Sequence, residues 1–268
     1  MNRITKLVLL GSALTGFAAC AASDEGPNPG PNEPNPPAQQ LSAEEYDEVA
    51  QSVGGVVVTT GGGGEVGAIA DSVSIAHGVV PLGFTVSASG DIEGQHGGLS
   101  YRYQLTCADA AGQTQPACDD ATDRADVTIA WSGTLELPRF RLDTERNGSW
   151  TLTGLTGDTA ALAGDSDFHV AVEAEPLAGP QLRTYDLDYT ASYDAIRIDN
   201  ADGDIVAGSA HFAIAAERTE SGNGHDSHLA FDVDAVVTFD GDDTATLVLD
   251  GQYTYEVDLA TGRAQRLP

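Results

Sequence analysis

The residues best suited to chemistry lie in the short polar segment SGNGHDSH, which contains His225, Asp226 and His228. Imidazoles and carboxylates are ligands for zinc and related ions, but a specific zinc site needs three or four of them. The remaining histidines could complete the set only through the fold; they are His77, His96, His169 and His211. We therefore interpret the segment as an exposed hairpin loop and predict no metal ion or other cofactor.

Two acidic segments are the next candidates. The segment DNADGD, Asp199–Asp204, has the composition of a calcium loop. The EF-hand pattern, set by its glycine, would place the first and twelfth ligands on Ile198 and Ser209, and neither residue carries a carboxylate. We interpret this segment, and FDGDDTAT at 239–246, as hairpin turns.

A row of tyrosines, Tyr185, Tyr189 and Tyr193, could stack on a sugar or another planar ligand. Aromatic side chains at alternate positions are more typical of the buried face of a sheet. We interpret the row as part of the core, so that the small-molecule ligand, if one exists, stays unknown.

The chain lacks the short motifs of common enzymes: a nucleophile elbow, a zinc-protease helix and a reactive cysteine pattern. The glycine run Gly61–Gly64 lacks the lysine and hydroxyl of a phosphate-binding loop. We predict a non-enzymatic protein. A hydrolase with dispersed acidic residues remains the alternative, because carboxylate pairs distant in sequence leave no motif.

The composition excludes one class of partner. The chain has 41 acidic and 12 basic residues, a formal net charge of −29, and no lysine after Lys6. Nucleic-acid binding requires a basic surface that contacts phosphates, so it is excluded, and binding of the domain to anionic lipid is disfavoured. Because the acidic residues are spread along the chain, we interpret them as a solvated surface.

The N-terminus has the organisation of an export signal. Arg3 and Lys6 precede an apolar stretch, Leu7–Ala19, which is too short for a membrane span of about 20 residues. A short positive segment followed by such a stretch is typical of a secretory signal peptide. We assign residues 1–19 to it.

The end of this segment, Phe17-Ala18-Ala19-Cys20, resembles the lipobox of bacterial envelope lipoproteins, although Phe17 replaces the usual leucine. The resemblance implies that Cys20 becomes the first mature residue and carries a thioether-linked diacylglycerol. Ala21 after the cysteine implies the outer membrane. The alternative is ordinary cleavage near Ala19 and a secreted protein.

Residues 20–40 form the expected link to the domain. Six prolines lie between Pro27 and Pro37, and no large apolar residue lies between Ala21 and Gln40. Such a segment cannot bury enough apolar surface to fold and is typical of an extended spacer. We therefore predict a lipidated cysteine, a tether, and one β-rich domain over residues 41–268.

The other two cysteines, Cys107 and Cys118, form an even pair once Cys20 is lipidated. An exported chain folds in an oxidising compartment, which favours a disulfide between them. A metal site would need further ligands, and no histidine lies nearby.

The domain begins with helical signals. In LSAEEYDEVAQSVGG, Ser42 and Glu45 have the spacing of a capping box. We expect this helix to end at Gly54, and we expect a second short helix in EVGAIADSVSIAHG. Its apolar residues at helical spacing are Val66, Ile69, Ala70 and Val73.

From about Leu82 onward the apolar period changes to two, which is typical of strands with one buried face. The clearest run is RTYDLDYTASYD, in which aromatic and aliphatic residues alternate with aspartate, threonine and serine. Dipeptides that favour tight hairpins separate the runs; they are Asn147-Gly148, Asp202-Gly203, Asp250-Gly251 and Thr261-Gly262. We predict an antiparallel meander of about ten to twelve strands, curled into a barrel, half-barrel or sandwich.

The leading hypothesis from sequence is a lipid-anchored envelope protein that serves as a structural or protein-interaction module, with the membrane and an envelope protein as its partners. The alternative is a carrier of lipid or another apolar ligand. A helix followed by a long curling meander resembles the half-barrel carriers of the lipoprotein-sorting pathway, in which helices cover an apolar concave face.

Overall fold

The computed structural model describes residues 41–57, 64–96, 98–137, 140–174, 182–222 and 225–268. Two helices come first, α1 (Ala43–Val57) and α2 (Glu65–Ala76). The strands follow as β1 (Phe84–Val86), β2 (Ile92–His96), β3 (Leu99–Asp109), β4 (Thr122–Leu137), β5 (Phe140–Thr153), β6 (Thr159–Ala174), β7 (Leu182–Asp199), β8 (Ile205–Gly222), β9 (His225–Phe239), β10 (Thr244–Leu249), β11 (Tyr253–Asp258) and β12 (Ala264–Arg266). The predicted signal peptide, lipidated Cys20 and tether lie outside the described residues.

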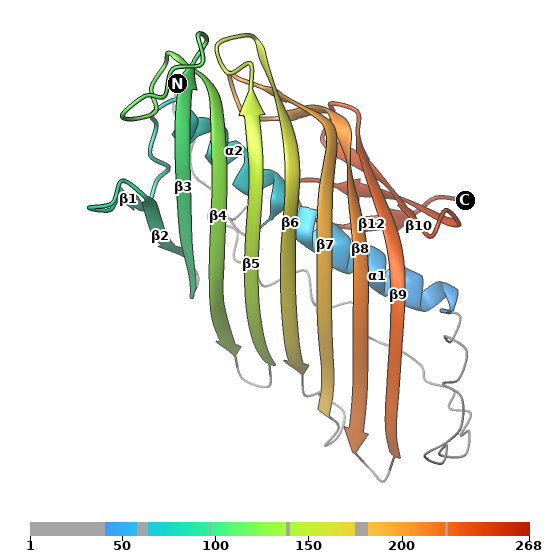
Figure 1. The fold of residues 1–268 in the computed structure, drawn as a ribbon. Coiled ribbons are helices and arrows are strands. Elements are labelled where there is room, and N and C mark those ends of the chain that lie inside the picture. Colours follow the sequence, from blue (N-terminus) through green and yellow to red (C-terminus); the bar gives the residue numbers. More distant parts are fainter. Residues whose placement is uncertain (1–40, 58–63, 97, 138–139, 175–181, 223–224) are drawn as a thin grey trace, which may run out of the picture.

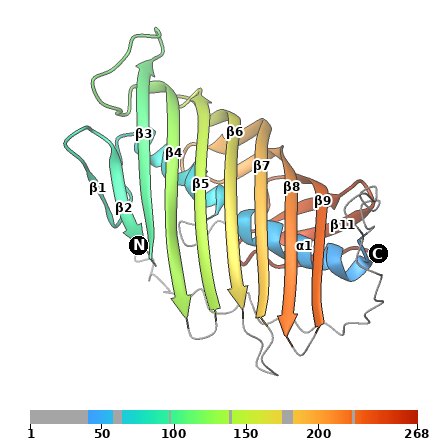
Figure 2. The same ribbon diagram turned by 60° about the horizontal axis from the view of Figure 1, so that its bottom comes forward.

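All described strands belong to one antiparallel sheet of 12 strands, whose spatial order follows the chain from β1 to β12. The sheet is not closed, because β1 and β12 form its two edges. The predicted meander is therefore confirmed, and of the three forms considered the closed barrel is excluded. Both helices lie against one face of the sheet (Figures 1 and 2), and α1 also contacts β10, β11 and β12.

The start of α1 follows the predicted capping box. The Ser42 amide donates to Glu45 Oε2 over 2.7 Å, and the Glu45 amide donates to Ser42 Oγ over 3.3 Å. The predicted end at Gly54 is wrong, since α1 continues to Val57. A Cβ at Gly54 would lie 2.2 Å from the carbonyl oxygen of Gly262. Glycine here allows the helix to approach the β11–β12 turn closely, and it does not stop the helix.

Three of the four predicted turns are confirmed. Asp202-Gly203, Asp250-Gly251 and Thr261-Gly262 connect consecutive strands, and Asp250 and Gly251 both have positive φ angles, 49° and 64°. Asn147-Gly148 is wrong as a turn, because both residues lie inside β5. A Cβ at Gly148 would lie 2.9 Å from Ile129 Cγ2 and 3.3 Å from the Trp150 ring, so glycine makes room for buried neighbours.

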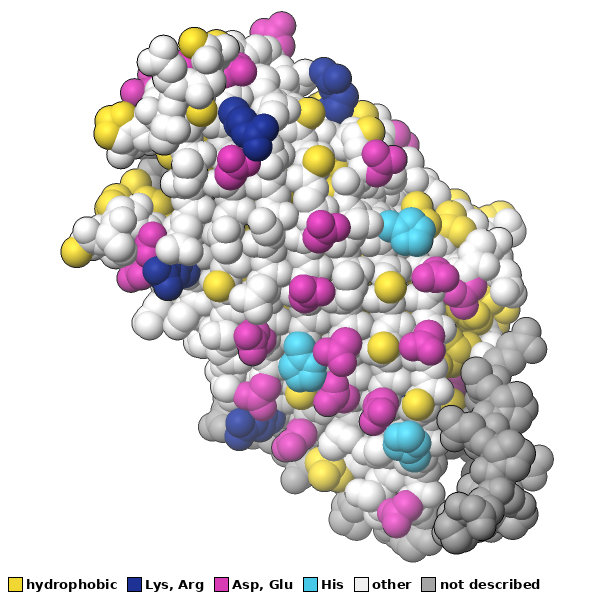
Figure 3. Space-filling view, in the orientation of Figure 1, with side chains coloured by type: hydrophobic (Ala, Val, Ile, Leu, Met, Phe, Trp, Pro, Cys, Tyr) yellow, Lys and Arg dark blue, Asp and Glu magenta, His cyan; other side chains and the backbone are white. Residues whose placement is uncertain are grey.

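Alternation along the long strands divides the sheet into two unlike faces. The helix-side face contains the buried residues, which include Tyr189 and Tyr193 of the predicted tyrosine row in β7, whereas Tyr185 of that row is only partly buried. The outer face is polar and acidic (Figure 3). Its exposed carboxylates include Glu145, Asp165, Asp167, Asp186, Asp188, Glu217, Asp232 and Asp234. This pattern is the one expected of an antiparallel sheet with one face in water.

Candidate functional site

The aromatic residues of the helix-side face are tied to the helices by their hydroxyl groups. Tyr189 Oη lies 2.5 Å from Ser52 Oγ of α1, and Tyr255 donates to Asp47 Oδ1 over 3.0 Å. Tyr46 of α1 in turn donates to Asp250 Oδ2 over 2.5 Å. Buried hydroxyls need such partners. These hydrogen bonds hold α1 against the sheet, since one donor, Tyr255, lies in the sheet and another, Tyr46, lies in the helix.

A buried polar cluster lies where α2 begins. Glu65, the first residue of α2, forms an ion pair with Arg146 of β5, and both side chains are nearly inaccessible to water. Ser166 donates to Glu65 Oε1 over 3.0 Å and lies within 3.0 Å of the Tyr193 hydroxyl. The Arg146 guanidinium also lies 5.3 Å from the centre of the Trp150 ring. Paired charges of this kind are tolerated in a core only when hydrogen bonds surround them.

Burial changes the acid–base properties of the tyrosines on this face. It raises the pKa of Tyr189 and the pKa of Tyr101 to about 12. The pKa of Tyr193 is also raised well above its ordinary value, by burial first and then by the Glu65 carboxylate. These hydroxyls are therefore neutral at physiological pH; those of Tyr189 and Tyr193 are hydrogen-bonded, whereas that of Tyr101 has no hydrogen-bond partner among the described residues.

Two carboxyl groups of the described helices have raised pKa values, and burial is the first cause for both Glu48 of α1 and Asp71 of α2. Burial raises the pKa of Asp71 in α2, although a hydrogen bond of 3.3 Å from the Tyr103 hydroxyl opposes the shift. Perturbed carboxyl groups also occur at catalytic sites. Here the partner is a tyrosine of the core, which is consistent with a packing contact between α2 and β3.

An open trough of about 520 Å³ lies at the β1 end of the sheet. Most side chains in its lining belong to the outer face and are hydroxyl, amide or charged groups. They include Thr85, Glu93, Gln95, Ser100, Arg102, Ser132, Glu145 and Asn147. Arg102 is engaged by Asp91, to which its Nε donates over 3.0 Å. The trough is open and its lining is mixed in polarity, unlike the mostly apolar, enclosed pockets that hold small ligands.

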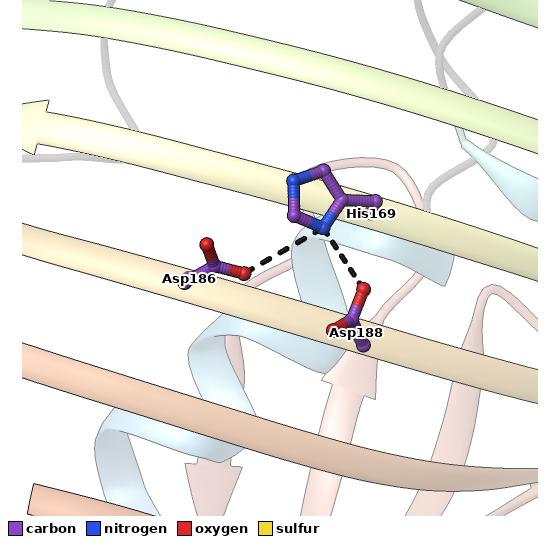
Figure 4. Close-up of side chains that lie close together, drawn as sticks. All are labelled: His169, Asp186 and Asp188. Carbon is purple, nitrogen blue, oxygen red and sulfur yellow. Dashed lines mark hydrogen bonds and ion pairs between the residues drawn. The ribbon is translucent and has the colours of Figure 1, made fainter.

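Three metal-ligating side chains come together on the outer face (Figure 4): His169 of β6 and Asp186 and Asp188 of β7. His169 Nδ1 lies 2.9 Å from Asp188 Oδ1 and 3.6 Å from Asp186 Oδ1. His169 and Asp188 face each other across the two strands, and Asp186 is two residues along. Exposed contacts of this kind also arise as ordinary ion pairs, which add little to stability.

The segment singled out from sequence does not form a metal cluster in the described part of the chain. Asp226 and His228 are exposed on β9, and His228 Nε2 lies 3.7 Å from Glu217 Oε2. The side chain of His225 lies outside the described residues. The meeting of His169 with two aspartates could have been found only by aligning β6 with β7, since no local motif marks it.

The acidic segments are hairpin turns, as predicted. The Asp199 side chain accepts a hydrogen bond from the Ala201 amide over 2.8 Å, and Asp202 accepts one from Asp204 over 3.2 Å. In the β9–β10 turn, Asp242 Oδ1 accepts hydrogen bonds from both the amide and the hydroxyl of Thr244. These carboxylates stabilise turns through their own backbone.

In agreement with the sequence prediction, the structure joins Cys107 and Cys118 by a disulfide, with the two Cα atoms 5.4 Å apart. The bond links the end of β3 to the segment before β4. It constrains the loop that connects the long strands β3 and β4.

No protein family, curated protein or solved structure matches this chain. Neither described helix has the length and apolarity needed to cross a bilayer.

Proposed function

We propose that this chain is a lipid-anchored bacterial envelope protein whose domain is a non-enzymatic structural or protein-interaction module. The support for a passive module is the part of the helix-side face that the two helices cover. The helices α1 and α2 pack on it, and hydrogen bonds between Tyr189 and Ser52 and from Tyr255 to Asp47 join the sheet to α1. Such a face is a core, whereas a carrier needs room for its cargo.

The anchoring part of the proposal rests on the sequence around Cys20 and is tested separately. Globomycin, which blocks lipoprotein signal cleavage, should cause the precursor to accumulate in the native host. Cys20→Ser should abolish partition into detergent. A mature protein that begins beyond Cys20 and carries no acyl mass would show that the chain is secreted. Because Ala21 follows the cysteine, we also propose that the protein is sorted to the outer membrane. Fractionation of the envelope tests this part of the proposal.

A carrier of lipid or another apolar ligand is the second candidate, and one observation favours it. The long strands continue past the helices (Figures 1 and 2). On the helix-side face they carry apolar side chains that are only partly buried, among them Val170, Leu187 and Phe231. A row of this kind is the surface that an acyl chain would contact. The described side chains offer no observation that favours a hydrolase.

Native mass spectrometry of the unacylated protein distinguishes the module from the carrier. We expect no co-purifying lipid and no saturable binding of a fluorescent fatty acid. Suppose instead that lipid co-purifies in stoichiometric amount, is lost in Leu187→Ser and is kept in the outer-face control Ala215→Ser. This result would refute the passive module and support the carrier. Both variants need only retain the cooperative unfolding transition of the parent for the comparison to hold.

A further inference from the structure

The segment that leads into the sheet is apolar and exposed. Val79, Val80, Leu82 and Val86 have exposed fractions of 58%, 39%, 98% and 59%. We call these four residues the edge patch. They lie between α2 and the end of β1, and β1 is a free edge of the sheet (Figure 1). The other exposed large apolar residues in the described part of the chain, Leu182 and Leu267, are isolated in sequence.

The segment that carries the edge patch is uncharged, unlike the rest of the chain. Residues 78–90 contain no aspartate, glutamate, lysine, arginine or histidine, in a protein of which 20% is charged. The outer face beyond it is strongly acidic. An apolar, uncharged surface is complementary to a neutral apolar phase. The segment itself has no basic residue, and Arg102 of β3, which lies two strands away beyond Glu93 of β2, is engaged by Asp91, so this arginine offers little attraction to anionic headgroups.

The size and shape of the edge patch decide between classes of partner. Its exposed area is roughly a few hundred Å², which is in the range of functional patches on monomers. Each partner in a stable protein complex buries about 800 Å². Leu82 is almost fully exposed and protrudes. A protruding apolar tip of this size is too small for a stable protein interface, whereas it can enter the fluid boundary of a bilayer.

We propose that the edge patch inserts into the neutral boundary region of the lipid bilayer and sets the orientation of the domain on the membrane. The inference rests on the proposed anchoring at Cys20. Residues 21–40 link Cys20 to the domain, and a chain of that length spans at most about 70 Å. Confinement within that distance raises the effective concentration of lipid, so a weak contact suffices.

The test attaches the chain to vesicles chemically, which makes it independent of acylation in cells. Cys107 and Cys118 are bonded to each other, so Cys20 is the one free thiol among the 3 cysteines of a chain beginning at residue 20. It is coupled to a maleimide lipid in phosphatidylcholine vesicles. Leu82→Trp places an indole on the edge patch, and Leu267→Trp is the matched control, since Leu267 is 41% exposed beyond β12 at the other edge of the sheet.

The native tryptophans give a constant background, because Trp131 and Trp150 are buried. We expect brominated phosphatidylcholine to quench the indole introduced at position 82 at least twofold and to leave that at position 267 unchanged. The extent should fall when anionic phosphatidylglycerol replaces half of the lipid. Equal quenching at both positions, or none at position 82, would overturn the proposal. An emission blue shift that depends on protein concentration without vesicles would also overturn it, because a second copy would then cover the patch.

Failure of this assay and failure of the proposed anchoring are separate results. A secreted protein would still give the quenching signal once coupled to the vesicle. A lipoprotein whose edge patch stays in water would pass the globomycin test and show no quenching.

Discussion

Two adjacent glycines in α1 should respond in opposite ways to the same substitution. Both lie inside the helix, where alanine is favoured over glycine by about 1 kcal/mol. A Cβ at Gly55 meets nothing within 4 Å, so Gly55→Ala should raise the free energy of unfolding by up to about 1 kcal/mol. A Cβ at Gly54 would lie 2.2 Å from the Gly262 carbonyl oxygen, which is backbone.

The Gly54→Ala variant must therefore separate α1 from the β11–β12 turn. Gly262 is held there, since its amide donates to the Asp258 carbonyl over 2.8 Å. Overpacking of this kind costs about 1–3 kcal/mol or more. Because the clash is with backbone, the cost should lie at the upper end of that range and outweigh the gain of about 1 kcal/mol in helix propensity, so that the net change is a loss of about 2 kcal/mol.

Urea denaturation of the two variants, followed by the fluorescence of the two buried tryptophans, measures both changes. A Gly54→Ala variant at least as stable as the parent would refute the close packing of α1 on this turn. It would also weaken the case that the helix is a fixed part of the core. The dependence of the unfolding free energy on urea concentration, the m value, should be the same in both variants and the parent. A variant with a changed m value has an altered denatured state, and its stability is then compared through the midpoint concentration of urea.

Four further predictions follow from the core and the charge of the chain. Arg146→Met should cost about 3–5 kcal/mol because it leaves Glu65 buried and unpaired, and adding Glu65→Gln should recover most of the loss; strict additivity in denaturant titrations would contradict the pairing. Reduction of the Cys107–Cys118 bond should cost about 3 kcal/mol, measured by unfolding with and without dithiothreitol, and an unchanged midpoint would contradict a constraining role. Burial raises the pKa of Tyr189 to about 12, above its unfolded value near 10. Its contribution to stability is therefore complete below about pH 10 and is lost as the pH rises through about 12. Tyr189→Phe should make this alkaline loss of stability shallower, and an identical dependence of stability on pH would count against the argument. Because the net charge is −29, the melting temperature should rise when NaCl or KCl increases from about 0.01 to 0.1 M, which shortens the screening length from about 30 to 10 Å; an effect of Ca²⁺ alone would instead indicate specific cation binding.

The alternation of apolar and polar residues predicted the sheet well because it reports directly which side of a strand is buried. It also places Tyr189 and Tyr193 on the inner side, where the structure has them. The same rule places Arg146 on the face of Trp150, so a buried arginine could have been suspected from sequence. Its partner, Glu65, could not, since nothing local indicates where a helix packs on a sheet.

Glycines were the main source of error. A glycine allows a positive φ angle, but it also leaves the space of a missing side chain. Gly251 has the first role, in a turn, whereas Gly54 and Gly148 have the second. A sequence pattern cannot separate these roles, because the second depends on residues far away in the chain. The contact of His169 with Asp186 and Asp188 escaped prediction for a similar reason, since it requires the register of β6 against β7.

The contacts between α1 and the last strands have a consequence for the order in which the domain forms. Each strand pairs with its neighbour in the chain, so hairpins can form in the order in which they are synthesised. The first helix, in contrast, can pack only after the last strands are present. Asp47 binds Arg266, and Gln51 accepts a hydrogen bond from the Ala264 amide. More than 200 residues therefore separate α1 from these partners in the chain, and until they are in place its apolar side requires protection by a chaperone or by transient contact with the growing sheet.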